Sequence, residues 1–128
     1  MSSDTKREVF NKTNGHCAYC GKTLNFEGDW HIDHIKPKWA GGSNNISNKY
    51  PSCILCNTRK YLHTPEEFKD FMKSQIIKRQ EYAIGKYLFY LSDYLKPEEY
   101  KKITSAYHKF IGTIENMPIK FYYEQMEK

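Results

Sequence analysis

The sequence has no long hydrophobic run, and this absence excludes several classes of protein. Its first ten residues are polar, unlike a secretory signal, and no later stretch is long enough to span a bilayer. It also has no internal repeat and no low-complexity linker. We therefore expect an intracellular, soluble protein, in the cytoplasm or with the nucleoid or nucleus, whose cysteines stay reduced. The many Lys, Ile, Asn and Tyr residues hint at an A+T-rich genome such as that of a phage or virus.

Net charge is modest, at +5 over 128 residues, but it is unevenly distributed. Residues 1–64 contain nine Lys and Arg against five Asp and Glu, whereas residues 65–128 contain eleven against ten. The basic excess in the first half suits a polyanionic partner. The eleven Tyr, seven Phe and two Trp exclude a disordered chain, and the length allows one domain, or one small domain with an appendage.

The four cysteines form two Cys-x2-Cys pairs, Cys17 with Cys20 and Cys53 with Cys56. Each such turn points two thiolates at one tetrahedral ion, so the two pairs predict a four-thiolate Zn²⁺ site. Four thiolates leave no position for a substrate, so the ion would be structural and would supply folding free energy. Redox-active cysteines are the alternative, but the chain lacks the βαβ context that they need.

The segment His31-Ile32-Asp33-His34-Ile35 lies between the two pairs, in a short strand expected from Trp30 to Ile35. Successive side chains of a strand point to opposite faces, so Asp33 and His34 should perform different tasks. A carboxylate is a hard ligand suited to Mg²⁺, and a histidine can abstract a proton near neutral pH. Phosphodiester hydrolysis requires both functions. His31 alternates with Asp33 and could face the same ion, but it is assigned no role.

Two asparagines extend this candidate site. Asn57 directly follows the last cysteine, and it is either a second ligand of the ion or the N-cap of the helix after the cysteine pair. Asn48 lies in a second extended piece expected from Ile46 to Ser52. There its amide could fix the preceding loop, 41–45, and orient His34.

Four basic side chains flank the candidate site. Lysine and arginine at such positions contact phosphates without reading the base sequence. The alternative is a solvated basic face with no ligand. The four residues are Lys36, Lys38, Arg59 and Lys60.

The pattern becomes helical from Thr64 onward. Residues 64–67 combine an N-cap, a proline at the first helical position and a glutamate at the third, as in a capping box. Apolar residues then recur at helical spacing over 68–95 and again over 100–114. Whether Gly85 divides one long helix or separates two is left open. We interpret these stripes as core, packed on the first half or on each other. They also allow the chain to form a homodimer through these helices.

Together these elements resemble the HNH endonuclease family in its zinc-bound form. The resemblance covers roughly residues 14–70. It rests on Cys17/Cys20, Asp33-His34-Ile35-Lys36-Pro37, Gly41-Gly42, Asn48, and Cys53/Cys56-Asn57 with Lys60. The resemblance implies an α+β fold, in which a small ββα-metal (His-Me finger) nuclease core is stapled by the four-cysteine zinc site and followed by a C-terminal helical region.

The resemblance also implies a role for each matching residue. Lys49 stands where an aliphatic residue often follows the middle asparagine, so Asn44 and Asn45 remain alternatives for that position. Because Asn57 and not a histidine stands at the last position of the motif, the pattern is a His-Asn-Asn variant. The implied roles are general base for His34, metal ligands for Asp33 and Asn57, and orienting asparagine for Asn48.

We therefore predict a nuclease core over residues 1–63 and a helical extension over 64–128 that packs on it. The predicted function is a metal-dependent endonuclease that hydrolyses phosphodiester bonds, with double-stranded DNA as the expected substrate. Its cofactors would be structural Zn²⁺ and catalytic Mg²⁺ or Mn²⁺. The alternatives are a non-catalytic zinc-stabilised module that binds nucleic acid and a zinc-stapled domain whose helices bind a protein. Catalysis is favoured because a scaffold has no need of Asp33, His34 and Asn57 at these spacings.

Overall fold

The structure is a computed structural model that describes residues 3–126. The chain forms two compact units. Unit 1 runs to Phe68 and takes in the chain again from Ile119, and unit 2 is Lys69–Pro118. Within residues 3–126, no helix combines the length and apolar character that a membrane crossing requires.

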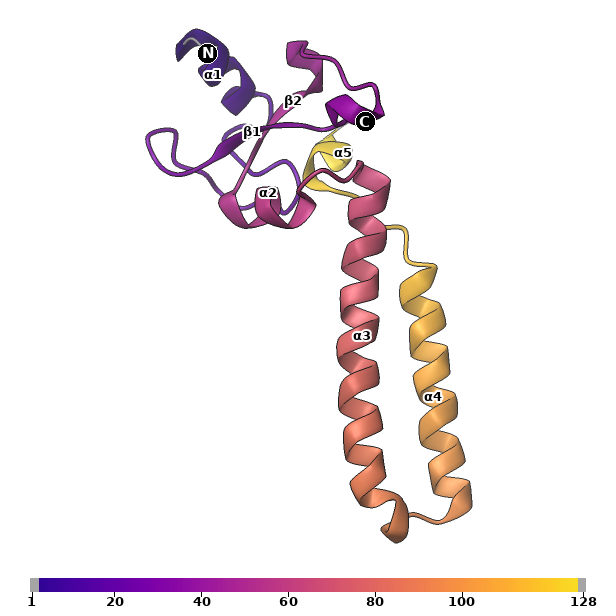
Figure 1. The fold of residues 1–128 in the computed structure, drawn as a ribbon. Coiled ribbons are helices and arrows are strands. Elements are labelled where there is room, and N and C mark those ends of the chain that lie inside the picture. The colour runs from indigo at the N-terminus through magenta and orange to yellow at the C-terminus, as the bar shows by residue number, and fades with distance from the viewer. Residues whose placement is uncertain (1–2, 127–128) are drawn as a thin grey trace. The chain divides into compact units, whose positions relative to one another are not determined.

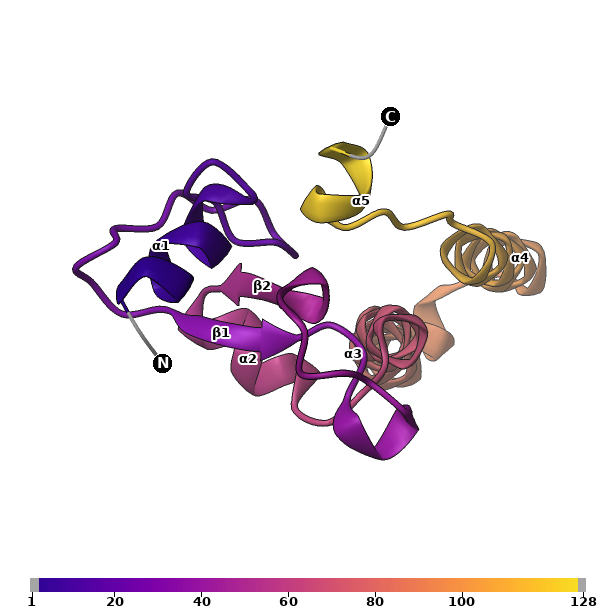
Figure 2. The ribbon, with the colours of Figure 1, turned by 90° about the horizontal axis from the view of Figure 1, so that it is seen from above.

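Unit 1 is built on a two-stranded antiparallel sheet. The strands are β1, His31–His34, and β2, Lys49–Ser52, and their register pairs Asp33 with Tyr50 and His34 with Lys49. Helix α1, Ser3–Asn11, packs against β2, and helix α2, Ile54–Lys60, packs against β1. Both ribbon views show the strands between these two helices (Figures 1 and 2). This mixed architecture, with two strands, a following helix and a helical C-terminal region, confirms the predicted fold class.

Two short turns connect the strands. The 3-10 helices η1, Lys38–Ala40, and η2, Ile46–Asn48, lie in this connection. The extended piece expected from Ile46 therefore begins as a turn, and only its last four residues pair with β1. Gly42 is required here because a Cβ at this position would collide with the Lys36 carbonyl oxygen. This close approach folds the loop back on the end of β1.

Aromatic rings from distant parts of the chain fill the core of unit 1. The ring of Tyr19 packs edge-on against Phe68 and Phe121, at centroid distances of 5.5 and 5.0 Å. Phe121 immediately precedes α5, Tyr122–Met126. The backbone N–H of Tyr123 donates to the Ala18 carbonyl at 2.8 Å. The tail is thus part of unit 1 and pairs with the backbone between Cys17 and Cys20.

Unit 2 consists of two long helices joined by a short turn. Helix α3, Pro65–Leu91, begins in unit 1 and continues without a break through Gly85, which answers the question that the sequence left open. The turn contains η3, Ser92–Tyr94, and α4, Pro97–Glu115, returns. At the start of α3, the predicted capping box is confirmed: the Thr64 N–H donates to the Glu67 carboxylate, and the Glu67 N–H donates to the Thr64 hydroxyl. The hydrogen bond from the Thr64 backbone lowers the pKa of Glu67.

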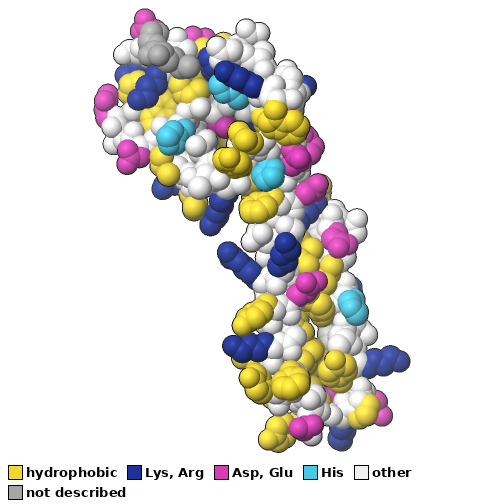
Figure 3. Space-filling view, in the orientation of Figure 1, with side chains coloured by type: hydrophobic (Ala, Val, Ile, Leu, Met, Phe, Trp, Pro, Cys, Tyr) yellow, Lys and Arg dark blue, Asp and Glu magenta, His cyan; other side chains and the backbone are white. Residues whose placement is uncertain are grey.

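The apolar stripes of unit 2 are only partly covered. Ile114 is buried, but several large rings are mostly exposed, and Figure 3 shows hydrophobic side chains along the surface of these helices. Two helices can cover only the sides that face each other. The interpretation of the stripes as core therefore holds for a minority of their residues. Tyr82, Phe89, Tyr90 and Tyr94 are exposed rings outside the stripes. The exposed residues of the stripes themselves are Ile76, Tyr87, Leu91, Tyr100, Ile103 and Phe110.

Candidate functional site

The four cysteines come together at one point of unit 1. Their sulfur atoms all lie within 4.8 Å of one another. Tetrahedral Zn²⁺ with Zn–S bonds of about 2.3 Å requires S–S distances of about 3.8 Å, so small movements would complete the site. Cys17 and Cys53 are buried, whereas Cys20 is exposed. The donor set and its spacing thus fit one metal ion with no position left open for a substrate.

Local backbone geometry places each pair of thiols. In the first pair, Gly21 has a φ of +77°, and its N–H donates to the Cys17 carbonyl at 2.9 Å, which closes the turn. In the second, Cys53 is the N-cap of α2, and its sulfur accepts from the Cys56 N–H at 3.4 Å. The N-cap role considered for Asn57 is therefore wrong, because α2 begins at Ile54 and Asn57 lies inside it.

Hydrogen bonds and burial shift the pKa values of Cys17, Cys20 and Cys56. A hydrogen bond from the Cys56 thiol lowers the pKa of Cys17 to about 4. The same hydrogen bond raises the pKa of Cys56. Burial raises the pKa of Cys20. A cation bound by all four sulfurs would therefore displace protons from Cys56 and Cys20.

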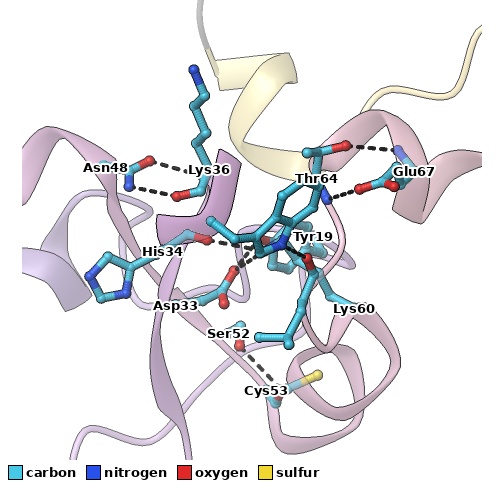
Figure 4. Close-up of polar contacts among 12 residues, drawn as sticks. Tyr19, Asp33, His34, Lys36, Asn48, Ser52, Cys53, Lys60, Thr64 and Glu67 are labelled. Carbon is cyan, nitrogen blue, oxygen red and sulfur yellow. Dashed lines mark hydrogen bonds and ion pairs between the residues drawn. The ribbon is translucent and has the colours of Figure 1, made fainter. Parts of the chain in front are cut away.

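Asp33 is held in the interior of unit 1 by two partners. Its Oδ2 accepts a hydrogen bond from the Tyr19 hydroxyl and lies 3.1 Å from the Lys60 Nζ (Figure 4). The side chains of Lys60 and Asp33 are only 1% and 10% exposed. Burial, and next the negative charge of Asp33, raise the pKa of Tyr19, so its phenol remains a donor. Lys60 also donates to the His34 carbonyl at 3.0 Å and so holds both residues of the pair.

Both partners of Asp33 belong to the metal-binding segments. Tyr19 lies between Cys17 and Cys20, and Lys60 ends the helix that Cys53 caps. A metal ion that fixes these segments would therefore also fix the carboxylate of Asp33. The sequence patterns did not point to Tyr19, whose position inside a Cys-x2-Cys turn was its only signal.

His34 lies beside Asp33 on β1 but is half-buried rather than interior. Its Nε2 is 3.1 Å from the Asn44 Oδ1. An amide oxygen accepts, so Nε2 donates here, and in the neutral imidazole Nδ1 then carries the lone pair. The sequence ranked Asn44 below Asn48 for contact with His34, whereas the structure brings Asn44 to the ring.

Asn48 holds the loop that carries Asn44. Its Oδ1 accepts from the Lys36 N–H at 2.9 Å, and its Nδ2 donates to the carbonyls of Lys36 and Ser43 at 3.0 and 2.8 Å (Figure 4). The Ile35 N–H also donates to the Asn48 carbonyl at 2.9 Å. Asn48 thus acts on His34 indirectly, by fixing the chain on both sides of the loop.

The remaining candidate residues occupy different environments. Asn57 is half-buried in α2, and His31 is exposed on β1. Lys36, Lys38 and Arg59 are exposed, as expected of side chains available to phosphates. Lys60 differs from that expectation, because its ammonium is buried against Asp33.

A groove of about 480 Å³ opens beside Asp33 and His34. It is bordered by the end of α2 and by η1. The lining residues are Ile32, Asp33, His34, Pro37, Lys38, Trp39, Lys60, Tyr61 and Leu62. An extended polar ligand could therefore reach His34 from solvent.

Comparison with known proteins shows which family the segment around this site resembles. Residues 17–61 match the family model described as HNH endonuclease, a segment that begins at the first cysteine and includes both strands and α2. The chain is also 31% identical over 84 residues to the SPbeta prophage-derived putative HNH endonuclease YoqL of Bacillus subtilis (strain 168). That alignment covers 54% of this chain and 35% of the relative, so the chain spans about a third of the relative's length.

Proposed function

We propose, from the premise that residues 17–61 are an HNH endonuclease domain, that this chain hydrolyses phosphodiester bonds of DNA with the help of a divalent ion. His34 is the general base, and Asp33 and Asn57 hold the ion, which we take to be Mg²⁺ or Mn²⁺. The four cysteines hold a separate, structural Zn²⁺.

The observation that carries this proposal is that Asp33 and His34, neighbours on β1, lie in different environments suited to different tasks. The carboxylate of Asp33 is fixed in the interior by Tyr19 and Lys60. The imidazole of His34 borders the groove and is held by Asn44 through its Nε2. Its Nδ1 can therefore accept the proton of a water molecule that attacks a phosphate in the groove.

The residues around Asp33 fit a hard cation. Tyr19 and Lys60 engage Oδ2, which leaves Oδ1 as a ligand atom, and the amide of Asn57 on α2 would add a neutral oxygen. When bound, such an ion would stabilise charge on the phosphate and on the leaving oxygen. Lys60 keeps the carboxylate from turning, because it also donates to the backbone of His34.

Cleavage of supercoiled plasmid tests this function. With Mg²⁺ or Mn²⁺ present, we expect the native protein to nick or linearise the plasmid, and we expect His34→Ala to be slower by roughly 10²–10⁴-fold because the base is lost. His108→Ala is the matched control, since His108 is an exposed histidine on α4 in unit 2.

Two outcomes would contradict the proposal. Equal rates for the native protein and His34→Ala would remove His34 from the mechanism. DNA binding without any cleavage would favour the non-catalytic nucleic-acid-binding module. A parallel assay on RNA of the same length as the DNA shows whether DNA is the preferred substrate.

We also propose that two copies associate through unit 2. Large exposed rings, among them Tyr87, Phe89 and Tyr94, support this partner, because exposed apolar patches mark interaction sites. Sedimentation equilibrium should give a dimer that Phe89→Lys converts to monomer. Lys102→Glu, an exposed change on α4, is the control. A monomeric native protein would end this proposal.

A further inference from the structure

Two exposed aromatic rings border the groove beside His34. Trp39 is 63% exposed and Tyr61 is 73% exposed, and both line this groove with Asp33 and His34. Neither ring is needed by the mechanism proposed above. Exposed aromatics at a polyanion site are the side chains on which unpaired bases stack.

The backbone under the two rings is tied together. Trp39 belongs to η1, and its indole N–H donates to the Leu62 carbonyl at 2.6 Å. Leu62 follows Tyr61 directly. This bond joins the loop after β1 to the turn after α2, so the backbone that carries both rings is held at the groove.

Tyr61 occupies a backbone conformation that disfavours a side chain. Its φ is +50° and its ψ is −117°, and it is one of two non-glycine residues with positive φ within 3–126. Glycine would adopt this conformation with less strain. The ring is largely in solvent, so burial does not explain why a tyrosine stands there. A strained residue of this kind at a site is evidence for a role in that site.

The charge around the rings suits a nucleic-acid strand. Lys38 lines the same groove and is exposed, and Lys36 lies two residues before it. A strand whose phosphate lies at His34 would keep its next phosphates near these ammonium groups. Its bases would then lie against Trp39 and Tyr61 only if they were unpaired, because paired bases present their edges and not their faces.

We propose that Trp39 and Tyr61 form a base-stacking subsite that receives unpaired nucleotides next to the phosphate that is cut. This subsite rests on the proposed nuclease function for its place beside the scissile bond. It makes DNA with a short unpaired stretch the preferred substrate over fully paired DNA. Stacking tolerates every base, so the preference is for structure and not for sequence.

Binding measured without Mg²⁺ or Mn²⁺ tests the subsite. The probes are two fluorescein-labelled DNAs of equal length, one fully paired and one with two central unpaired nucleotides. The native protein should bind the unpaired probe more tightly. Trp39→Ala and Tyr61→Gly should each weaken that binding about tenfold and should leave the paired probe nearly unchanged.

Tyr61→Gly separates a stacking role from a structural one. It relieves the positive φ, so its thermal midpoint should equal or exceed that of the native protein while its affinity falls. Tyr94→Ala is the matched control, because Tyr94 is an exposed tyrosine of unit 2.

Tryptophan fluorescence supplies a direct signal. The chain has two tryptophans, and Trp30 is only 7% exposed, so quenching by unlabelled unpaired DNA should come from Trp39 and disappear in Trp39→Phe. Equal affinity of the native protein for both probes, an equal loss for both probes in the variants, or no quenching would overturn the subsite. If the plasmid is not cut while these binding results hold, the nuclease function fails and the stacking subsite stands.

Discussion

The two units of this chain are stabilised in different ways. In unit 1 the strands are four residues long, and the interior contains polar groups such as Thr13, Ser52 and the Asp33–Lys60 pair beside the cysteines. In unit 2 the helices are 27 and 19 residues long, although α3 starts in unit 1, and most large apolar side chains remain partly exposed. Unit 1 therefore combines specific polar bonds with a cysteine cluster able to hold a metal, whereas unit 2 depends on helix formation and a thin apolar seam.

Removal of the metal should produce the largest difference in stability between the two units. Cys17→Ser, or a thiol reagent that extracts Zn²⁺, should remove on the order of 10 kcal/mol of apparent stability from unit 1. Both tryptophans lie in unit 1, so their fluorescence should report its unfolding. Circular dichroism at 222 nm should keep most of its helical signal from unit 2.

Readdition of Zn²⁺ after the reagent is quenched should restore the fluorescence, and about one ion per chain should be released. Simultaneous loss of both signals would mean that the units are one cooperative body. If neither signal is lost, a metal ion does not stabilise unit 1.

The buried ion pair offers a smaller effect on the same unit. Lys60→Met leaves the Asp33 carboxylate without its cation in the interior and should destabilise unit 1 by about 3–5 kcal/mol. Urea unfolding followed by tryptophan fluorescence measures this change at fixed Zn²⁺. The double variant Lys60→Met/Asp33→Asn should recover part of the loss, because no uncompensated charge remains.

Lys102→Met, an exposed lysine of α4, is the control and should change stability by less than about 0.5 kcal/mol. A Lys60→Met protein as stable as the native one would show that Lys60 can leave the interior. Lys60 would then be available to phosphates, as the sequence predicted.

Substitution of two glycines should produce the smallest stability changes, with opposite signs in the two units. Gly42→Ala should destabilise unit 1 by more than about 1 kcal/mol, because the new methyl group meets the Lys36 carbonyl. Gly85→Ala should stabilise α3 by about 0.5–1 kcal/mol, since nothing lies within 4 Å of the added Cβ. Thermal unfolding read by fluorescence for the first and by circular dichroism for the second checks both. The same sign for the two substitutions would contradict the distinction drawn between the units.

Spacing along the chain carried most of the prediction of unit 1. Metal-binding turns and short extended segments are local patterns, so the two cysteine pairs and the two strands could be predicted from the sequence, whereas the fold that joins them was implied by the family resemblance. The burial of Lys60 could not, because its position next to exposed Arg59 looks solvated and only the tertiary contact with Asp33 reverses that. Asn44 was ranked low for a similar reason: the loop conformation, set by Gly42 and Asn48, decides which amide reaches His34.

Helical periodicity predicted α3 and α4 but not how much of them is covered. The stripes specify which side of each helix is apolar, while coverage depends on how many other elements pack there. The return of the chain to unit 1 also left no periodic signal. Phe121 and its neighbours form a short aromatic run after the second helix, yet their partners Tyr19 and Phe68 lie far away in sequence.

The stacked rings of Phe68 and Phe121 have a topological consequence. Their centroids are 5.4 Å apart, and they stand at the two points where the chain leaves unit 1 and rejoins it. The helical hairpin of unit 2 therefore lies, in chain order, between two segments of unit 1. Because the two ends of unit 1 already meet, the inserted segment can lengthen, shorten or be exchanged without changing the distance that it must bridge.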